Sequence, residues 1–337
     1  MKLCILPRVE GIGGMASFRY KFEQGLRARG VEVTHDADSA PDAILVIAGT
    51  KNLAALYRAK RRGARIVQRL DGMNWVHRKR NTGLRHFLRA EYGNFILSFI
   101  RKYLADAIIY QSEFSRAWWQ RVYGETSAPA HVILNGVDLN AYSPAPIAPP
   151  APPYRILLVE GNLGGGYEMG LDNALALTEA LAAQHQLDVE LIVAGQIEAA
   201  QRERATSRAS VPVQWRGAIP REEVPALMRS CHLLFSADLH PACPNVVIEA
   251  LACGLPVAAF DTGAVSELVI GGAGRVVPYG TNSWNIEPPR ISPLADAARE
   301  ILLRRDIFSQ AARKRAEDQL GLERMTGSYL NALAPPL

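Results

Sequence analysis

The sequence predicts an α/β protein of two domains, each built on a parallel sheet with helices on both faces. Short apolar runs rich in Val, Ile and Leu alternate with helical patterns in both halves of the chain, and a proline-rich segment separates the halves. The length of 337 residues suits about two domains of ordinary size. With 48% hydrophobic and 21% charged residues, the composition is that of a globular protein and excludes a disordered or fibrous one.

The first domain is expected over residues 1–142. Its apolar runs are short, which suits strands better than helices, and most are followed by a helical pattern. The expected strands are Leu3–Leu6, Val31–His35, Ala43–Ala48, Ile66–Gln68, Ala107–Tyr110 and His131–Leu134. The expected helices lie near residues 15–29, 51–62, 84–104 and 112–122.

A linker is expected at residues 143–153, which hold six of the 21 prolines. Proline fixes φ and lacks a backbone N–H, so such a run can form neither the interior of a helix nor a central strand. We expect an extended, semi-rigid connection between the two domains.

The second domain is expected over residues 154–320 and repeats the pattern of the first. The expected strands are Arg155–Val159, Glu190–Ala194, Val213–Trp215, Leu233–Ser236, Pro256–Phe260 and Arg275–Val277, with helices near 171–186, 222–229, 245–252 and 293–319. Residues 321–337 carry a further helical pattern, which either closes the second domain or crosses back to the first. The repeated alternation predicts two Rossmann-like, doubly wound domains that face each other across a cleft, with ligands beyond the carboxyl ends of the strands.

The net charge of +5 is unevenly divided along the chain. Residues 1–142 hold 22 Lys and Arg against 12 Asp and Glu, whereas the rest of the chain holds 16 against 21. One basic and one acidic half indicate two modules with different partners.

The basic residues of the first half form two clusters. The first comprises Arg58, Lys60, Arg61, Arg62 and Arg65, and the second, interleaved with aromatic residues, comprises Arg78, Lys79, Arg80, Arg85, Arg89, Arg101 and Lys102. A basic helical region with aromatic side chains can lie on anionic lipid headgroups, grip nucleic acid, or form a solvated face over a buried apolar stripe. We expect peripheral contact with an anionic membrane and no nucleic-acid partner.

A cytoplasmic location is expected. If the basic half attaches to a membrane, the protein would lie at the inner face of the plasma membrane. The segment Met1–Arg8 meets a proline and a charge before the apolar core of a signal peptide could form, and no run approaches 18 consecutive apolar residues. The four cysteines are too few for a disulfide scaffold and suit a reducing compartment.

A glycine-rich segment follows the first expected strand of each domain. These segments are Gly11-Ile12-Gly13-Gly14 and Gly161-Asn162-Leu163-Gly164-Gly165-Gly166-Tyr167. Glycine lets backbone N–H groups approach an anion, and a helix N-terminus favours negative charge, although plain turns are the alternative. Neither segment has the full dinucleotide fingerprint, which disfavours a Rossmann dehydrogenase.

The segment from Ser236 to Val257 contains the largest group of candidate functional residues. A loop stiffened by two prolines leads to a helix that starts near Asn245, and the N-terminal amides of that helix would point at a ligand. Glu249 lies in the second turn, where a carboxylate can accept hydrogen bonds from two sugar hydroxyls. A solvated helical glutamate is the alternative.

No metal site is expected. Cys231, His232, His240 and Cys243 are close in sequence, but their spacing matches no usual zinc pattern. Asp36-Ala37-Asp38 forms a D-x-D that can hold a metal–diphosphate, yet its place between two expected strands favours a surface loop.

Together these residues resemble the retaining, nucleotide-sugar-dependent glycosyltransferases of family four, which have the GT-B fold. The resemblance covers nearly the whole chain and is strongest over Asn245–Glu267. There, Asn245–Val257 is similar to the core signature of the family, and Asp261–Val269 to the loop and helix that follow it. Gly271–Pro278 resembles the next turn and strand.

The resemblance implies a role for each matching residue. Glu249 matches the second glutamate of the E-x7-E motif, which binds the donor ribose, and Glu267 lies near the nucleotide. The loop that holds the donor sugar corresponds to Pro241, Ala242, Cys243, Pro244 and Asn245. The residues expected beside the donor diphosphate are Gly13, Gly14, Gly161 and Asn162.

The sequence departs from the family pattern in three places. The first glutamate of E-x7-E would be residue 241, which is Pro241, so His240 or Asp238 takes part of its role. The Arg and Lys that usually neutralise the diphosphate are missing from Gly161–Gly166, which leaves Arg216 as the nearest basic candidate. A histidine of the acceptor domain is also missing, and the next strand end offers Asp71 instead.

The resemblance implies a metal-independent, retaining hexosyltransferase that needs no cofactor. A sugar would move from a nucleotide-sugar donor in the acidic half to a glycan or lipid-linked acceptor at the basic half, in cell-surface polysaccharide or glycolipid synthesis. The leaving diphosphate can take the proton of the attacking hydroxyl, so the protein orients the reactants and stabilises charge. Asp71 would orient the acceptor hydroxyl or act as a base, and His240 is the second catalytic candidate.

Two alternatives stay open. The first is another GT-B enzyme, such as a nucleotide-sugar epimerase, which converts one sugar without an acceptor. The second is a non-catalytic module that binds nucleotide sugars on the same fold.

Overall fold

The computed structural model of the protein describes residues 1–11, 13–163 and 168–334. The chain forms two compact units: unit 1 comprises Met1–Gly136 and Leu322–Leu337, and unit 2 comprises Val137–Gly321. Unit 1 carries 23 Lys and Arg against 12 Asp and Glu, and unit 2 carries 15 against 21. The uneven charge of the sequence is therefore also a difference between the two units.

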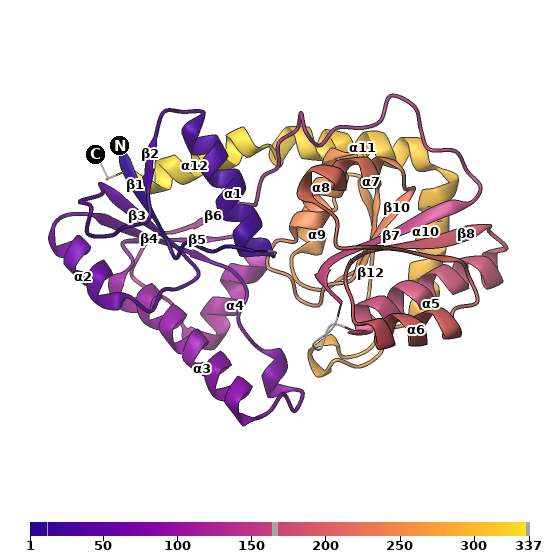
Figure 1. Ribbon diagram of the computed structural model, residues 1–337, viewed down its shortest axis with the longest axis horizontal. Helices are drawn as coiled ribbons and strands as arrows, with labels where there is room; N and C mark the ends of the chain where they lie inside the picture. The colour runs from indigo at the N-terminus through magenta and orange to yellow at the C-terminus, as the bar shows by residue number, and fades with distance from the viewer. Residues whose placement is uncertain (12, 164–167, 335–337) are drawn as a thin grey trace. The chain divides into compact units, whose positions relative to one another are not determined.

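Unit 1 is built on a six-stranded parallel sheet in the order β2-β1-β3-β4-β5-β6 (Figure 1). Its strands are β1 (Lys2–Leu6), β2 (Glu32–Thr34), β3 (Ala43–Ile47), β4 (Arg65–Leu70), β5 (Ala107–Tyr110) and β6 (Ala130–Val132). This order extends the flavodoxin-like order 2-1-3-4-5 by one strand. The order reverses between β1 and β3, so a ligand is expected beyond the carboxyl ends of these strands.

Helices cover both faces of the unit 1 sheet because alternate strand residues point to opposite faces. Leu3 and Ile5 of β1 pack in one buried cluster with Phe18 and Phe22, whereas Cys4 packs on the other face. The helical elements are α1 (Gly14–Arg27), α2 (Leu53–Arg61), η1 (Val76–Arg78), α3 (Leu84–Phe99), the π-helical turn η2 (Ile100–Leu104) and α4 (Glu113–Tyr123).

The last helix, α12 (Leu322–Leu333), packs on unit 1 beside α1 (Figure 1). The ring of Tyr329 lies 5.2 Å from that of Phe18 and 5.0 Å from that of Phe22. Thr326 presses against Gly25, where a β-carbon would overlap its side chain. Of the two alternatives for residues 321–337, the structure therefore shows the helix that returns to the first domain.

Unit 2 is built on a second six-stranded parallel sheet, in the order β12-β11-β10-β7-β8-β9. Its strands are β7 (Tyr154–Asn162), β8 (Val189–Gln196), β9 (Val213–Gly217), β10 (Leu233–Ser236), β11 (Val257–Phe260) and β12 (Gly274–Val277). This is the strand order of a dinucleotide-type Rossmann sheet, and it reverses between β7 and β10. The predicted fold class is thus confirmed in both units.

Helices flank the second sheet as well. They are α5 (Glu168–His185), α6 (Ala199–Arg208), η3 (Arg221–Glu223), α7 (Val224–Arg229), α8 (Asn245–Ala252), α9 (Val265–Leu268), η4 (Ser283–Asn285), α10 (Ile291–Leu303) and α11 (Arg305–Gln319). The helix expected over residues 293–319 is in fact two helices, because the backbone leaves the helical conformation at Arg304. Helix α6 was not expected, since its sequence is mostly polar.

The proline-rich segment 143–153 is part of unit 2 and does not lie between the units. Nη1 of Arg229 donates to the carbonyl of Ser143, and Nε2 of His232 lies 3.3 Å from the carbonyl of Pro149. The chain passes from one unit to the other at Gly136, earlier than the linker that we expected. The prolines stiffen a segment that docks on its own unit.

Candidate functional site

In unit 2, the residues that follow β7 and β10 form the candidate donor site. Strand order reverses between these two strands, which is where open α/β sheets bind ligands. Glu160 and Gly161 lie at the end of β7, and Asp238 and His240 follow β10. Burial raises the pKa of both carboxyls, and the charge of Asp238 raises that of Glu160 further. Within the described residues, no ion pair neutralises either of them.

His240 is held in an uncommon conformation at this site. Its φ of 55° lies in the left-handed region that non-glycine residues rarely adopt. Its ring stacks on that of Trp284 from η4, with centroids 3.6 Å apart and planes 11° apart. Burial lowers the pKa of His240 to about 4, although a hydrogen bond with the backbone of Ser283 acts in the opposite direction. The imidazole is therefore neutral at neutral pH and can both donate and accept a hydrogen bond.

The loop that begins at Pro241 is braced by the turn after β11. The backbone N–H of Ala264 donates to the carbonyl of Pro241 at 2.9 Å, and Oγ1 of Thr262 donates to the carbonyl of Asp238. Gly263 has a φ of 64°, and a β-carbon there would lie 2.5 Å from the Pro241 nitrogen. This turn therefore needs glycine both for its backbone angle and for the close approach of the loop.

Helix α8 follows the loop and begins at Asn245, with Pro244 in the capping position. The loop residues Ala242 and Cys243 connect His240 and Pro241 to this helix start. Glu249 is only 9% exposed, so the alternative of a solvated helical glutamate is wrong. Its charge raises the pKa of Tyr142, which burial raises more strongly. The carboxylate thus sits among buried groups of unit 2.

The predicted diphosphate-binding residues lie at exposed chain segments of two units. In unit 1, Gly13 is the N-cap of α1, with a φ of 131°, and Gly14 is its first residue. In unit 2, Gly161 and Asn162 end β7 and are exposed. Ile12 and Gly164–Tyr167, the remainder of the two glycine-rich segments, lie outside the described residues.

Two further predicted donor residues, Arg216 and Glu267, lie in other elements of unit 2. Arg216 lies in the edge strand β9 and lines a cavity of about 480 Å³ that also includes Arg155 and Glu190. Arg155 and Glu190 are near the starts of β7 and β8, opposite the carboxyl ends. Glu267 lies in α9, where its backbone carbonyl accepts a hydrogen bond from Arg315. Donor contacts of Arg216 and Glu267 stay predictions.

In unit 1, Asp71 directly follows β4 and is part of a buried polar network. Its carboxylate accepts hydrogen bonds from Nη1 of Arg69 and from Nε2 of Gln111. Its backbone carbonyl accepts from Nε1 of Trp119 at 2.8 Å. Burial raises the pKa of Asp71, and the neighbouring Arg69 offsets part of this rise. A carboxylate that is 26% exposed and so oriented can act on a hydroxyl group.

The partners of Asp71 were not identified from the sequence. Arg69 is 1% exposed, and its guanidinium lies 3.8 Å from the centroid of Phe18 and donates to Oδ1 of Asn135 at 3.0 Å. Nδ2 of Asn135 donates in turn to Oε1 of Gln111. Gln111 and Asn135 each follow an expected strand, as Asp71 does, so the rule that selected Asp71 could also have found them.

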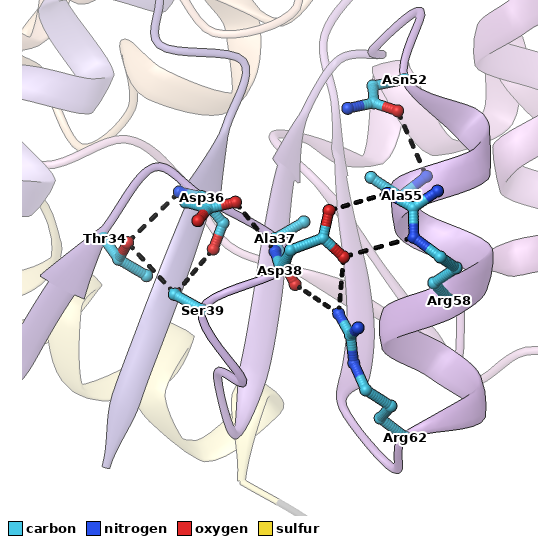
Figure 2. A network of polar contacts seen from close by, with 9 residues as sticks. All are labelled: Thr34, Asp36, Ala37, Asp38, Ser39, Asn52, Ala55, Arg58 and Arg62. Atoms are coloured by element: carbon cyan, nitrogen blue, oxygen red, sulfur yellow. Dashed lines mark hydrogen bonds and ion pairs between the residues drawn. The ribbon is translucent and has the colours of Figure 1, made fainter.

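The D-x-D segment is a surface loop whose carboxylates are already engaged (Figure 2). Asp38 forms ion pairs with Arg58 at 2.7 Å and Arg62 at 2.9 Å, which lower its pKa to about 2. Oδ1 of Asp36 accepts from the backbone N–H of Asp38 and closes the turn. The segment serves local structure, as its place between two strands indicated.

The cysteine and histidine residues near His232 do not converge on a metal. Nδ1 of His232 accepts from the backbone N–H of Arg155 at 2.9 Å, and Nε2 faces the carbonyl of Pro149. Burial lowers the pKa of His232 to about 4, which keeps the ring neutral between these partners. In the part of the chain that the structure describes, no three His, Cys, Asp or Glu side chains lie close enough to share a metal ion.

Comparison with known proteins points to one family. A model of the family described as glycosyl transferases group 1 matches residues 155–303. The 2-deoxystreptamine glucosyltransferase of Streptomyces kanamyceticus is 26% identical over 138 residues, which are 40% of this chain and 34% of that protein. The matched part thus spans about a third of the curated relative.

Solved structures show the same fold over the whole chain. The crystal structure of Anabaena HepE in complex with UDP-glucose has a TM-score of 0.69 at 16% identity and covers 99% of both chains. WaaG, a glycosyltransferase involved in lipopolysaccharide biosynthesis, has a TM-score of 0.69 at 16% identity and covers 100% of both chains. Two parallel six-stranded sheets flanked by helices are thus the GT-B architecture. Residues 155–303 of this GT-B chain thus match the glycosyl transferases group 1 family.

Proposed function

We propose that the protein is a retaining glycosyltransferase whose unit 2 holds a nucleotide-sugar donor. The observation that carries this proposal is the set of groups at the ends of β7 and β10, within the family segment. A rigid loop from Pro241, the stacked pair His240 and Trp284, and the start of α8 all belong to this one strand end. Because the similar HepE structure contains UDP-glucose, UDP-sugars are the first donors to test.

The donor site works mainly through neutral groups. Backbone amides at Gly161 and at the start of α8 bind the diphosphate, and Glu249 binds the ribose. The raised pKa values of Glu160 and Asp238 favour a retained proton, which limits repulsion of a dianionic diphosphate. Neutral His240 offers a hydrogen bond to the donor sugar without adding charge. The leaving diphosphate accepts the proton of the attacking hydroxyl, so no metal or protein nucleophile is needed.

The acceptor is assigned to unit 1. Asp71 orients the acceptor hydroxyl through its fixed carboxylate, and the net positive charge of the unit suits an anionic glycan or a lipid-linked acceptor at the inner face of the plasma membrane. The cellular role that follows is synthesis of a cell-surface polysaccharide or glycolipid. No helix among the described residues is long and apolar enough to span a membrane.

Titration calorimetry with UDP and UDP-glucose tests the donor site. We expect Glu249→Gln and Glu249→Ala to weaken nucleotide binding by roughly tenfold to a hundredfold, because a carboxylate that accepts two hydroxyl hydrogen bonds is lost. The matched control is Glu203→Gln, which alters an exposed glutamate of α6 in the same unit. Circular dichroism checks that each variant is folded. Unchanged affinity in folded Glu249 variants would contradict the assignment.

A second candidate function is a non-catalytic module that binds nucleotide sugars. Pro241 favours it, because a proline replaces the first glutamate of the family motif and cannot bind a sugar through a side-chain carboxylate. Product analysis with UDP-glucose alone and with added acceptor glycans separates the alternatives. Binding without turnover supports the module, whereas a changed sugar from donor alone supports an epimerase.

A further inference from the structure

Helix α3 of unit 1 carries a row of apolar side chains on its solvent side. We call Leu84, Leu88, Tyr92, Phe95 and Tyr103 the α3 stripe; these residues are between 53% and 74% exposed. The first four recur at three- and four-residue spacing and therefore share one face of the helix. The opposite face is buried through Ala90, Asn94 and Ile96. A helix that is already packed on its inner face thus has a second apolar face with no described cover.

The α3 stripe continues past the end of the helix. The ring of Phe99 lies 6.2 Å from that of Phe95 and 5.2 Å from that of Tyr103 in the π-helical turn η2. These contacts join the two ends of the stripe into one aromatic row. Two of its members are tyrosines, whose rings are apolar and whose hydroxyls are polar, as suits residues at a boundary between water and hydrocarbon.

Positive charge flanks the α3 stripe and is not neutralised. Arg85 and Arg89 are exposed and make no ion pair or hydrogen bond within residues 1–11, 13–163 and 168–334. Lys102 extends its amine to 5.5 Å from the ring of Tyr103. The single acidic residue of α3, Glu91, is paired with Arg78, with Nε 2.6 Å from Oε1 and Nη2 2.8 Å from Oε2. The flank therefore presents cations that lack anionic partners.

We propose that the α3 stripe docks unit 1 onto an anionic lipid membrane. The stripe requires an apolar environment and its flank requires negative charge, and the headgroup region of an anionic bilayer supplies both within a few ångströms. A second copy of unit 1 would bring two strongly basic surfaces together, which disfavours self-association through this face. The delivery of a lipid-linked acceptor rests on the proposed function, whereas lipid binding itself does not.

Co-sedimentation with vesicles tests the proposal on the full chain. We expect the protein to pellet with vesicles of phosphatidylcholine and phosphatidylglycerol, weakly with phosphatidylcholine alone, and less as salt is raised. Leu84→Ser with Phe95→Ser should reduce binding about tenfold on both vesicle types, because buried apolar area is lost. Arg85→Gln with Arg89→Gln should reduce binding about tenfold on anionic vesicles only and flatten the salt dependence.

Matched controls lie in unit 2. Ile307→Ser removes an isoleucine of α11 that is 59% exposed, and Arg204→Gln with Arg299→Gln removes two exposed arginines. Both controls should bind vesicles as the unaltered protein does. Pelleting that is independent of vesicles, or equal loss in the control and stripe variants, would overturn the proposal. A dimer that forms in solution and is lost in Phe95→Ser, without vesicle binding, would assign the stripe to a second copy instead.

Calorimetry with UDP-glucose on the same variants separates this proposal from the proposed function. The stripe variants should keep the donor affinity of the unaltered protein, since α3 belongs to unit 1 and the donor loop to unit 2. Loss of vesicle binding with intact donor binding supports the membrane surface. Vesicle binding without any nucleotide binding would leave the surface standing and contradict the transferase.

Discussion

Unit 1 holds one carboxylate beside a buried guanidinium at the carboxyl ends of its strands, whereas unit 2 holds two carboxyls with no described ion pair. In unit 1, Asp71 bonds to Arg69 and Gln111, and Asn135 completes the network. In unit 2, Glu160 and Asp238 lie close enough for the charge of Asp238 to raise the pKa of Glu160. The carboxyl ends of the strands thus lie in different electrostatic environments in the two units, although the sheets are of the same type.

This difference affects how the carboxyl groups of each unit are oriented and protonated. Unit 1 keeps its carboxylate oriented because the cation and the amides around it are themselves fixed by packing, with Arg69 against the ring of Phe18. In unit 2 no described cation offsets the burial that raises the pKa of both carboxyls, whereas Arg69 offsets part of the rise at Asp71. A fixed carboxylate suits orientation of a hydroxyl group. Carboxyl groups that retain their protons suit an anionic ligand, because they do not repel it.

The largest effect is expected from Arg69→Met, which removes the cation of unit 1. It leaves Asp71 without its ionic partner and removes the hydrogen bond from Arg69 to Asn135, so we expect a loss of about 3–5 kcal/mol in the free energy of unfolding. Urea denaturation at neutral pH measures this loss. Arg121→Met on the exposed end of α4 is the control and should change stability by less than about 0.5 kcal/mol. If Arg69→Met is as stable as the control, the network does not hold Asp71.

Gly263→Ala should have the next largest effect because it breaks the brace of the donor loop in unit 2. Its matched control is Gly271→Ala, whose φ of 63° is almost the same but whose β-carbon would meet nothing within 4 Å. The control should lose about 1 kcal/mol for the backbone angle alone. Gly263→Ala should lose about 1–3 kcal/mol more and weaken UDP-glucose binding at least about tenfold, as thermal unfolding and calorimetry can show. Equal effects of the two variants would mean that the loop tolerates displacement.

A pair of carboxyl replacements should have effects of different size in the two units. Asp71→Asn should stabilise the protein less than Asp238→Asn does at neutral pH, because Arg69 offsets part of the burial that raises the pKa of Asp71 and would lose its carboxylate partner. Asp238→Asn should stabilise the protein at neutral pH. The pKa of Asp238 is raised in the folded state, so the folded protein binds more protons than the unfolded chain once pH exceeds the ordinary Asp value, and stability falls as pH rises through that window.

Melting temperatures measured from acidic to mildly alkaline pH test this pair. The difference between Asp238→Asn and the unaltered protein should vanish in acid and grow as pH rises. A melting temperature for Asp238→Asn that lies below that of the unaltered protein at every pH would show that the carboxylate form is the one stabilised.

The smallest effect is expected from Asp38→Asn, in the surface loop of unit 1. Its exposed ion pairs with Arg58 and Arg62 are screened by solvent, so stability should change little. Nucleotide-sugar binding should be unaltered, and its response to added magnesium or manganese should be the same as for the unaltered protein. A metal-dependent loss of binding in this variant would restore the D-x-D interpretation.

Elements with an apolar pattern could be predicted well. Each of the twelve expected strands overlaps an observed one, because short runs of Val, Ile and Leu leave few alternatives in an alternating chain. Helix α6 was missed because Ala199–Arg208 is mostly polar and gains its place from neighbouring elements. The break between α10 and α11 was missed because the helical pattern continues across Arg304.

The candidate site could be predicted only where one strand end identified it. Asp71, His240 and the loop from Pro241 each follow an expected strand, so the topology alone brings them to a ligand-binding edge. Trp284 could not be found, because its partner His240 lies more than 40 positions earlier and nothing local marks a ring stack. In the sequence, Arg69 cannot be distinguished from the other basic residues of the first half. Its burial against Phe18 is visible only in the structure.

The sequence by itself determined the alternation of strands and helices, the unequal charge of the two halves, and the motif that contains Glu249. These properties are local, since they depend on residue type and on spacing of a few positions. Only the tertiary structure decided that the proline-rich segment docks on unit 2, that α12 returns to unit 1, and that a buried cation accompanies Asp71 whereas none among the described residues accompanies Glu160 or Asp238. Those outcomes depend on which distant side chains exclude water together, and burial of that kind is a property of the folded chain.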